Sequence, residues 1–264
     1  MTVAFNYLGK LGQLGNQMFQ YASTKGIATH LGYDFMIPNH DEVFDDGIGN
    51  KLRIELDDPF TIDCKRGMIP TRDVREPGFE FSQKFFDRCP DNVNLFGFFQ
   101  TEKYFKHIED EIRNDFTFKK QIRDECQEIV EGVFNDPIAL HIRRGDFLIN
   151  SGNHHNLTLE YYEKALSKFD ANRDVIIFTD DPDWAKAQEL FSPDRFIISE
   201  GNSSYHDLYL MTQCSSFIIA NSSFSWWGAW LGNGEEVIAP SIWFGPNNAH
   251  LNTKDLYPRH WKIV

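Results

Sequence analysis

Short, continuously apolar runs alternate with helical patterns along this chain, most densely after about residue 136. Strands that are buried on both faces read as continuous apolar runs, and they occur in parallel sheets that helices cover. The sequence therefore predicts an α/β fold. The expected strands are 3–8, 33–38, 94–100, 137–142, 174–179, 195–198, 216–220 and 236–240. The expected helices are 17–30, 103–131, 161–169, one that begins at Asp181, and 206–214.

The 264 residues suit one large domain or two small ones, since a domain usually takes roughly 100–200 residues. The denser pattern in the second half favours two Rossmann-like halves, 1–135 and 136–264, that face each other across a cleft. One larger doubly wound domain is the alternative. Residues 39–95 carry scattered Asp, Gly and Pro among aromatic residues and predict no clear element.

The chain is acidic, with 39 Asp and Glu against 26 Lys and Arg and a formal charge of −13. Such a surface repels nucleic acid and anionic lipid, so we expect no nucleic-acid partner. A phosphate-bearing ligand would need a local cationic pocket. No apolar run approaches the ~18–20 residues that span a bilayer, and the first residues lack the pattern of a signal peptide. These features predict a cytosolic protein and leave peripheral contact with a membrane open.

Four cysteines occur at positions 64, 89, 126 and 214, and their spacing matches no zinc framework. We expect reduced, mostly buried thiols, as is typical of a reducing compartment.

A glycine-rich turn, 12–17, follows the first expected strand and reads Gly-Gln-Leu-Gly-Asn-Gln. Glycines let the backbone approach a ligand, and the start of the next helix offers N–H groups to an anion. The turn is not a G-x-G-x-x-G, and no acidic residue occurs at the expected later strand end, so a dinucleotide-binding fold is not supported. A purely structural tight turn is the alternative.

A second polar cluster, His141 to Asp146, ends the strand 137–142 and contains Arg143, Arg144 and Gly145. Ligands of open α/β sheets bind at the carboxyl ends of the strands. A guanidinium is always charged and can bond two phosphate oxygens at once. The cluster therefore predicts a diphosphate clamp that stabilises the charge of a leaving group without a metal. The alternative is a salt bridge between an arginine and Asp146, or two exposed charges.

The third cluster follows the strand 216–220 and reads Asn-Ser-Ser-Phe-Ser-Trp-Trp-Gly over 221–228. Hydroxyl and backbone donors at the start of a helix are typical of phosphate sites. Ser222, Ser223 and Ser225 are the candidate donors. An ordinary serine cap, with the tryptophans 226, 227 and 230 as core, is the alternative.

The fourth cluster, 179–183, reads Thr-Asp-Asp-Pro-Asp. Asp181 and Asp183 spell the D-x-D pattern of metal-dependent glycosyltransferases. A helix that begins with Asp181 as N-cap and Pro182 at its first position explains the same residues more simply. Asp180, at the strand end, could then accept hydrogen bonds from a base such as guanine. We therefore expect no metal.

Together these motifs resemble the α-1,2-fucosyltransferase family, which uses GDP-fucose. Their order matches, and they span residues 15–244. The motifs that carry the resemblance are 15–22 (Gly-Asn-Gln-Met-Phe-Gln-Tyr-Ala), 141–147 (His-Ile-Arg-Arg-Gly-Asp-Phe), 178–184 (Phe-Thr-Asp-Asp-Pro-Asp-Trp), 221–227 (Asn-Ser-Ser-Phe-Ser-Trp-Trp), and 237–240 (Val-Ile-Ala-Pro) followed by Trp243-Phe244.

The resemblance implies a GT-B type fold and transfer of L-fucose, with inversion, from GDP-β-L-fucose to a glycan hydroxyl, with a terminal β-galactoside as the expected α-1,2 acceptor. The donor would be held mainly by the C-terminal half. Arg143 would grip the β-phosphate, and Asn16 would lie beside the diphosphate and the departing sugar. Asp180 or Asp181 would read guanine, and His141 would contact the nucleoside. The remaining residues expected at the donor are Gly15, Gln17, Arg144, Ser222, Ser223 and Ser225.

In the expected mechanism the fucosyl carbon becomes oxocarbenium-like as GDP leaves, and an acceptor hydroxyl attacks from the opposite face. A general base would take the proton. Asp146, His154 and His155 are candidates, and a transition state without a base is the alternative. We expect Arg143, Asn16 and Asp146 to be the catalytic residues. Alternatives to this function are another nucleotide sugar, a metal-dependent transferase, and a non-catalytic protein that binds sugar nucleotides or carbohydrate.

Overall fold

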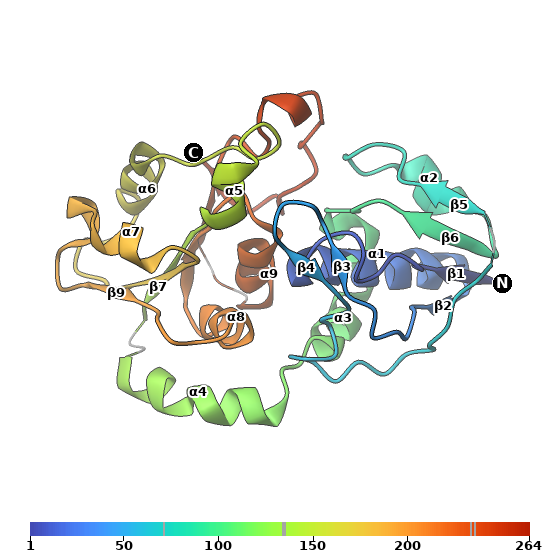
Figure 1. Ribbon diagram of the computed structural model, residues 1–264, viewed down its shortest axis with the longest axis horizontal. Coiled ribbons are helices and arrows are strands. Elements are labelled where there is room, and N and C mark those ends of the chain that lie inside the picture. Colours follow the sequence, from blue (N-terminus) through green and yellow to red (C-terminus); the bar gives the residue numbers. More distant parts are fainter. Residues whose placement is uncertain (71, 134–135, 233, 235) are drawn as a thin grey trace. The chain divides into compact units, whose positions relative to one another are not determined.

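The computed structural model describes residues 1–70, 72–133, 136–232, 234 and 236–264. The chain forms two compact units. The first, here called the N-terminal unit, contains Met1–Phe118 and Leu251–Pro258. The second, the C-terminal unit, contains Lys119–His250 and Arg259–Val264. Each unit holds a parallel sheet with helices (Figure 1), which confirms the predicted α/β class.

The N-terminal unit has a four-stranded parallel sheet in the order β2-β1-β6-β5. Its long helix α1 (Leu14–Leu31) is buried over most of its surface, as its largely apolar or small residues allow, and ends at Gly32 in the left-handed region with φ of 69°. The strands are β1 (Thr2–Ala4), β2 (Asp34–Met36), β5 (Asp73–Arg75) and β6 (Val93–Phe96). The other elements are the hairpin β3 (Phe44–Asp45) and β4 (Lys51–Leu52), α2 (Gln83–Arg88), η1 (Glu102–Tyr104), η2 (Lys106–Ile108) and α3 (Glu109–Asp115).

The C-terminal unit has a six-stranded parallel sheet in the order β12-β11-β10-β7-β8-β9. Read from β9, the chain order is third, second, first, fourth, fifth, sixth, the order of a dinucleotide-binding Rossmann sheet. The strands are β7 (Ile138–Ile142), β8 (Val175–Thr179), β9 (Phe196–Ile198), β10 (Ser216–Ile218), β11 (Glu236–Ala239) and β12 (Lys262–Ile263). The helices are α4 (Lys120–Val133), α5 (Gly145–Ile149), α6 (Leu159–Leu166), α7 (Pro182–Lys186), α8 (Ser204–Thr212) and α9 (Ser223–Gly232), with the short turns η3 (Glu189–Phe191) and η4 (Pro246–Asn248).

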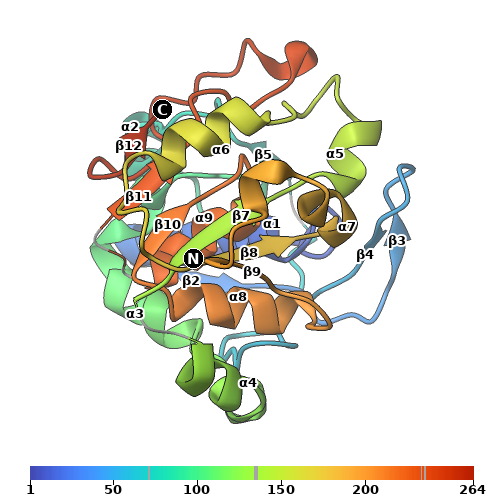
Figure 2. The ribbon, with the colours of Figure 1, turned by 90° about the vertical axis from the view of Figure 1, so that its left-hand side faces the viewer.

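Helices cover both faces of this second sheet, which is why its strands read as continuous apolar runs. Figure 2 shows α6 above the central strands and α8 below them. Ile138, Leu140 and Ile142 pack in one core cluster with Tyr162 of α6. All five residues of β7 are buried. Strand β7 is therefore held in place, and so are the residues that directly follow its carboxyl end.

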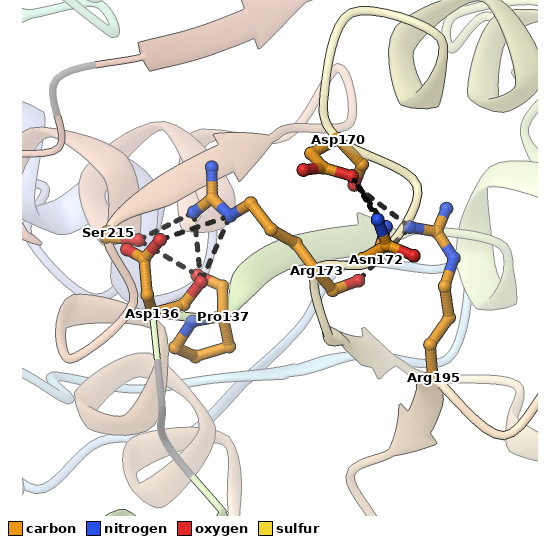
Figure 3. A network of polar contacts seen from close by, with 7 residues as sticks. All are labelled: Asp136, Pro137, Asp170, Asn172, Arg173, Arg195 and Ser215. Atoms are coloured by element: carbon orange, nitrogen blue, oxygen red, sulfur yellow. Dashed lines mark hydrogen bonds and ion pairs between the residues drawn. The ribbon is translucent and has the colours of Figure 1, made fainter.

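Arginines hold the amino ends of the same strands together (Figure 3). Arg173, just before β8, donates to the Asp136 carbonyl oxygen at 3.0 and 3.1 Å and to Ser215 Oγ at 2.8 Å. Arg195, just before β9, donates to the carbonyl oxygens of Ala171 and Arg173 at 2.9 and 3.1 Å. These bonds satisfy main-chain acceptors at the edge opposite to the strand ends where ligands bind.

The two units differ from the expected division, 1–135 and 136–264, at two places. Helix α4 belongs to the C-terminal unit, because it packs on α8 and its Glu125 Oε2 lies 2.6 Å from His206 Nε2. Residues 251–258 belong to the N-terminal unit, where Asp255 bonds Lys103 Nζ at 2.5 Å and the Phe81 N–H at 3.1 Å. Both differences arise from contacts between residues far apart in the sequence.

None of the helices in the described ranges combines the length and apolarity needed to cross a bilayer.

All four cysteines are free, and Cys89, Cys126 and Cys214 are buried. Burial raises the pKa of these three thiols. They fit the expected reduced, inert thiols.

Glu76, which follows β5, carries an acidic group in an unusual environment. Its Oε2 accepts a hydrogen bond from the Phe98 N–H at 2.8 Å, whereas Oε1 is buried without a hydrogen-bond partner in the described part of the chain. Burial raises the pKa of this carboxyl to about 7, although the main-chain donors of Phe98 and Phe99 oppose the shift. Folding therefore favours the protonated form.

The substitution Glu76→Gln is expected to stabilise the protein above pH 7. Because the folded pKa lies above the unfolded value of about 4.5, the stability from this group is complete below pH 4.5 and is lost as pH rises through 7. The variant should gain on the order of 1–2 kcal/mol over the parent at pH 8 and nearly nothing at pH 4.5. Urea unfolding at both pH values measures this gain. Glu42→Gln, at an exposed position of the same unit, is the control. An equal pH dependence in the parent and Glu76→Gln would contradict the assignment.

Candidate active site

The switch point of the C-terminal sheet lies between β7 and β10, where successive strands are added on opposite sides of β7. Ligands of such sheets bind at the carboxyl ends of the strands beside this point. The second predicted cluster, 141–146, ends β7, and the third, 221–228, follows β10. The two meet here, since the rings of His141 and Phe224 lie 5.5 Å apart. Sequence patterns far apart along the chain therefore form one site.

Arg143 is held by two carboxylates at this strand end. Its Nη2 lies 2.7 Å from Asp146 Oδ1, and its Nη1 lies 3.1 Å from Asp180 Oδ2. The side chain is only 21% exposed, and the guanidinium lies 5.6 Å from the Phe147 ring centroid. The pairing with Asp146, one of the alternatives expected from the sequence, is thus present. It fixes the plane of the guanidinium at the switch point.

Arg144 has a different environment from its neighbour. Its Nε donates to Asp181 Oδ2 at 3.0 Å, and its main-chain N–H donates to Asp180 Oδ1 at 2.8 Å. The guanidinium carbon lies 4.0 Å from the Trp184 ring centroid, a cation–π contact. These contacts tie the end of β7 to the start of α7. They favour a structural role for Arg144.

The carboxylates of Asp180 and Asp181 bond other residues of the protein. Asp180 bonds Arg143 and the Arg144 N–H, so both of its oxygens have partners. Asp181 is the N-cap of α7, accepts from the Trp184 N–H at 3.2 Å, and has Pro182 at the first position, which confirms the predicted cap. The guanine-reading role expected for one of these carboxylates stays a prediction. In the residues described by the structure, no group of three His, Cys, Asp or Glu is placed to hold a metal ion.

His141 is a buried, neutral histidine inside β7. It is 5% exposed, and its Nδ1 has no hydrogen-bond partner in the described part of the chain. Burial, with the nearby charge of Arg143, lowers the pKa of the ring to about 3. The ring is therefore uncharged at any physiological pH. A buried polar atom without a partner costs stability and marks a position where a ligand atom would be accepted.

The three serines of the 221–228 turn differ in their contacts. Ser225 is fully buried, and its Oγ donates to the carbonyl oxygens of Ser222 and Ala220 at 3.2 and 3.4 Å. Its hydroxyl is therefore internal to the turn. Ser222 and Ser223 lie at the start of α9, where the first main-chain N–H groups of a helix lack intrahelical acceptors. This end of α9 can bind an anion through Ser222, Ser223 and the main chain.

Asn221, which the sequence did not single out as a functional residue, holds the neighbouring loop. Its Nδ2 donates to the carbonyl oxygens of His155 and Trp243, both at 2.8 Å. His154 in this loop stacks on Phe147 at 4.0 Å. Burial lowers the pKa of His154, so its neutral form is favoured. A neutral imidazole can accept a proton, and the loop is held beside the Arg143 cluster.

The Gly-Asn-Gln turn lies in the N-terminal unit, at the switch point of its own sheet, between β1 and β6. Asn16 Oδ1 accepts a hydrogen bond from Gln100 Nε2 at 2.6 Å, and Gln100 follows β6. This bond fixes the orientation of the Asn16 amide, in which Nδ2 is the donor end. Gln100 lies 84 residues away in sequence and has no local signal. Gly15 is buried in the first turn of α1.

The Gln17 side chain makes hydrogen bonds to other residues of the protein. Its Nε2 donates to the carbonyl oxygens of Arg53 and Gly12 at 2.8 and 3.2 Å, and its Oε1 accepts from the Glu55 N–H at 2.9 Å. The side chain is fully buried. These bonds favour a role in holding the segment 53–55 rather than a ligand.

Comparisons with known proteins show the family of the chain. The sequence profile of Glycosyl transferase family 11 matches residues 5–264. The "Alpha-1,2-colitosyltransferase" of Escherichia coli is 31% identical, over 95% of this chain and 95% of that protein. The "O-antigen biosynthesis glycosyltransferase WbnK" of Escherichia coli is 28% identical, over 92% and 96%. The "Galactoside alpha-(1,2)-fucosyltransferase 1" of Alouatta caraya is 25% identical, over 86% of this chain and 65% of that protein.

Solved structures share the fold at low sequence identity. The "NodZ alpha-1,6-fucosyltransferase soaked with GDP-fucose" aligns over 95% of this chain and 97% of that chain, with a TM-score of 0.52 and 15% identity. "POFUT1 in complex with GDP-fucose" aligns over 100% and 97%, with a TM-score of 0.54 and 12% identity. The predicted GT-B type fold and the predicted enzyme class, a glycosyltransferase, are confirmed. This chain belongs to glycosyl transferase family 11.

Proposed function

We propose that this protein moves L-fucose from GDP-β-L-fucose, with inversion, to a hydroxyl of an acceptor glycan, with galactose as the acceptor sugar of an α-1,2 bond. The observation that carries the proposal is the meeting of Arg143, His141 and the serine turn at the switch point of the C-terminal sheet. The names of two similar proteins support the α-1,2 linkage. The name of one of them, a galactoside fucosyltransferase, supports fucose as the sugar and galactose as the acceptor. GDP-fucose in a protein of the same fold supports the donor.

In this proposal the C-terminal unit binds the GDP moiety. Arg143 binds the β-phosphate, because a guanidinium has five N–H donors in a plane and a phosphate can add to or replace its carboxylate bonds. The start of α9, with Ser222 and Ser223, binds the same diphosphate. His141 offers a neutral ring nitrogen to the nucleoside. Asp146 and Asp180 orient Arg143. Arg144 and Asp181 hold the β7 and β8 ends in place.

Charge builds up on the β-phosphate as the bond to fucose breaks. A fixed guanidinium and helix N–H groups stabilise that charge without needing to reorganise. We therefore propose that the reaction needs no metal ion, and Asp181, as an N-cap paired with Arg144, supports this. The proton of the attacking hydroxyl goes to His154, which is neutral, or to solvent.

Four free cysteines suit a reducing compartment, so we place the reaction in the cytoplasm.

Asn16 is proposed to act from the N-terminal unit, with its Nδ2 toward the diphosphate and the departing sugar. Gln100 is the positioning residue, because it binds the Oδ1 of the same amide. Gly12 is required for this geometry: a Cβ at this position would lie 2.1 Å from Asn16 Nδ2 and 2.8 Å from its Cβ. Gly12 also has φ of +89°, which side chains rarely adopt.

The substitution Gly12→Ala is expected to lower the transfer rate about 10–10²-fold, because it displaces the Asn16 amide. Gly49→Ala is the matched control, since Gly49 has φ of +106° but no atom lies within 4 Å of the added Cβ. Both variants should lose about 1–2 kcal/mol of unfolding free energy from backbone strain. Only Gly12→Ala should lose activity. Equal rates in the two variants would contradict the role of Asn16.

The donor is tested by a panel of nucleotide sugars, because a relative named as a colitosyltransferase leaves the sugar as the part to establish. Hydrolysis and transfer are measured with GDP-fucose, GDP-mannose and UDP-galactose at equal concentrations. We expect turnover with GDP-fucose and competitive inhibition by GDP but not by UDP. Turnover with UDP-galactose alone would contradict the donor assignment. Binding of GDP-fucose without turnover for any acceptor would favour a binding protein.

A further inference from the structure

The N-terminal unit has a cavity of about 410 Å³ beside the end of β1. Polar residues that include Asn6, Tyr7, Asp73 and Asn94 line it together with the apolar residues Met68, Ile69 and Pro70. All of its lining residues belong to this unit. None of them is among the residues predicted from the sequence to bind the donor. The cavity has the size of a site for a small ligand or one or two sugar rings.

A chain of hydrogen bonds holds one carboxylate in this cavity. Tyr7 Oη donates to Asp73 Oδ2 at 2.7 Å, and Asn94 Nδ2 donates to Asp73 Oδ1 at 2.6 Å. Asn94 Oδ1 in turn accepts from the Asn6 N–H at 2.6 Å. The bonds from Tyr7 and Asn94 lower the pKa of Asp73, so the carboxylate stays ionised at neutral pH. Each oxygen of this carboxylate has a second lone pair for another donor.

Burial distinguishes the two ends of this chain of bonds. Asn94 is 1% exposed and occupies an interior strand, where an apolar side chain is the ordinary choice. Asp73 is exposed, on the edge strand β5. The buried Asn94 amide therefore orients the exposed Asp73 carboxylate. This arrangement costs free energy, because a polar group is buried and side chains lose conformational entropy. Stability alone does not need an exposed carboxylate to be held in this way.

The chemistry of the cavity fits hydroxyl groups. An ionised carboxylate accepts hydrogen bonds from hydroxyls. The Asn6 amide bonds the main chain of Ile69 at 2.9 and 3.2 Å, and an amide has a second N–H and a second lone pair for a ligand. Tyr7 adds an aromatic ring, in an edge contact with Phe96 at 4.9 Å, on which an apolar sugar face can pack. Lys10, the lining cation, pairs with Glu42 at 3.5 Å. The cavity therefore suits a neutral polyhydroxylated ligand rather than an anion.

The cavity also has a suitable place in the fold. Asn6 and Tyr7 lie on the connection from β1 to α1, and Asn16 lies in the first turn of α1. Asn94 lies on β6, the strand that leads to Gln100. Both strands border the switch point of this sheet. A sugar in the cavity would thus be held by the same two chain segments that orient the Asn16 amide.

We infer that this cavity binds the acceptor glycan, with Asp73 accepting hydrogen bonds from sugar hydroxyls and Tyr7 and Asn94 fixing the Asp73 carboxylate. The inference rests on the proposed transfer to a glycan. It assigns a function to Met68, Ile69, Pro70 and Asp73, within the part of the chain, 39–95, for which the sequence predicts no element. Donor binding and donor hydrolysis by water do not need this cavity.

The test compares Asp73→Asn, Tyr7→Phe and Met68→Trp with the parent. Asp73→Asn removes the charge, Tyr7→Phe removes the bond to Asp73 but keeps the ring, and Met68→Trp fills the cavity from an exposed lining position. Asp91→Asn, exposed in the same unit and outside the cavity, is the control. Lactose is the acceptor probe. Two readouts are taken: the KM for lactose with GDP-fucose, and the rate of GDP-fucose hydrolysis without lactose.

The KM for lactose is expected to rise about 10–100-fold in Asp73→Asn and Met68→Trp and less in Tyr7→Phe, with hydrolysis unchanged. If Asp73→Asn does not fold, the KM of Met68→Trp tests whether the cavity binds the acceptor. An unchanged KM in Met68→Trp, with normal hydrolysis, would overturn the acceptor assignment and leave the proposed function intact. No hydrolysis and no transfer by the folded parent protein would instead overturn the proposed function.

Discussion

Replacing Arg143 by alanine is expected to slow fucose transfer about 10²–10³-fold, the effect of losing one fixed donor to a developing charge. Arg143→Lys should recover little of this rate. An ammonium keeps the charge but cannot bond Asp146, Asp180 and a phosphate in the plane of a guanidinium. The measurement is kcat/KM for GDP-fucose at saturating acceptor. Because the charge develops in the transition state, kcat should fall more than donor binding does.

Arg195→Lys is the control for this experiment. Arg195 belongs to the same unit, bonds main-chain carbonyl oxygens at the amino ends of the strands, and lies outside the proposed site. Its substitution should lower stability slightly and leave kcat within a factor of about two of the parent, as is usual away from a site. Turnover retained in a folded Arg143→Ala variant would contradict the clamp assignment.

Replacing Trp226 by alanine is expected to destabilise the C-terminal unit by about 3–5 kcal/mol, the usual cost of removing a buried aromatic side chain. Trp226 is fully buried and lies 5.1 Å from Trp227, 6.2 Å from Trp230 and 5.4 Å from Trp261. The cluster packs α9 against the C-terminal segment 259–264. Since α9 carries Ser222 and Ser223 at its start, the same cluster positions the proposed phosphate site.

Guanidinium unfolding, followed by far-ultraviolet circular dichroism, measures this loss. Trp226→Phe should cost clearly less than Trp226→Ala, because it keeps a ring in the cluster. Ser223→Ala should change stability little beyond the loss of a helix-start hydroxyl, about 1 kcal/mol. A loss below about 1 kcal/mol in Trp226→Ala would show that the tryptophans are not a core cluster.

The strands of the C-terminal unit could be predicted because burial on both faces makes them continuously apolar. Ile138–Ile142 is the clearest case, with all five residues buried. Strand β5 could not, because it is an edge strand whose residues Asp73, Val74 and Arg75 are two-thirds charged. A charged edge strand protects a sheet against pairing with other chains, so it carries no apolar signal. The same exposure makes Asp73 available to a ligand.

Local chemistry allowed one contact to be predicted correctly and left others undetermined. The Asp181 cap needs only its own helix start, and it is present as expected. The partners of Arg143 include Asp180, which is brought close by strand pairing rather than by sequence spacing. The Gln100–Asn16 bond likewise depends on the order β1-β6 in the sheet. The family resemblance places Gln17 at the donor, and its bonds to Arg53 and Glu55 could not be predicted because these partners lie 36 and 38 residues away.

The alternatives expected for the serine turn are both represented in the structure. Trp226, Trp227 and Trp230 are core residues, as the structural alternative holds. Ser225 is internal to the turn, while Ser222 and Ser223 lie at the helix start. The sequence spacing alone could not separate these roles, since all three serines lie within four positions.

The most direct test of this account is release of GDP from GDP-fucose in excess chelator, with a panel of galactose-terminated acceptors. The account predicts acceptor-dependent GDP release that chelator does not reduce, and a product in which fucose is α-1,2-linked to galactose. Release that requires an added divalent metal would contradict the metal-free clamp built on Arg143. Failure of the folded protein to bind GDP-fucose would contradict the donor assignment itself.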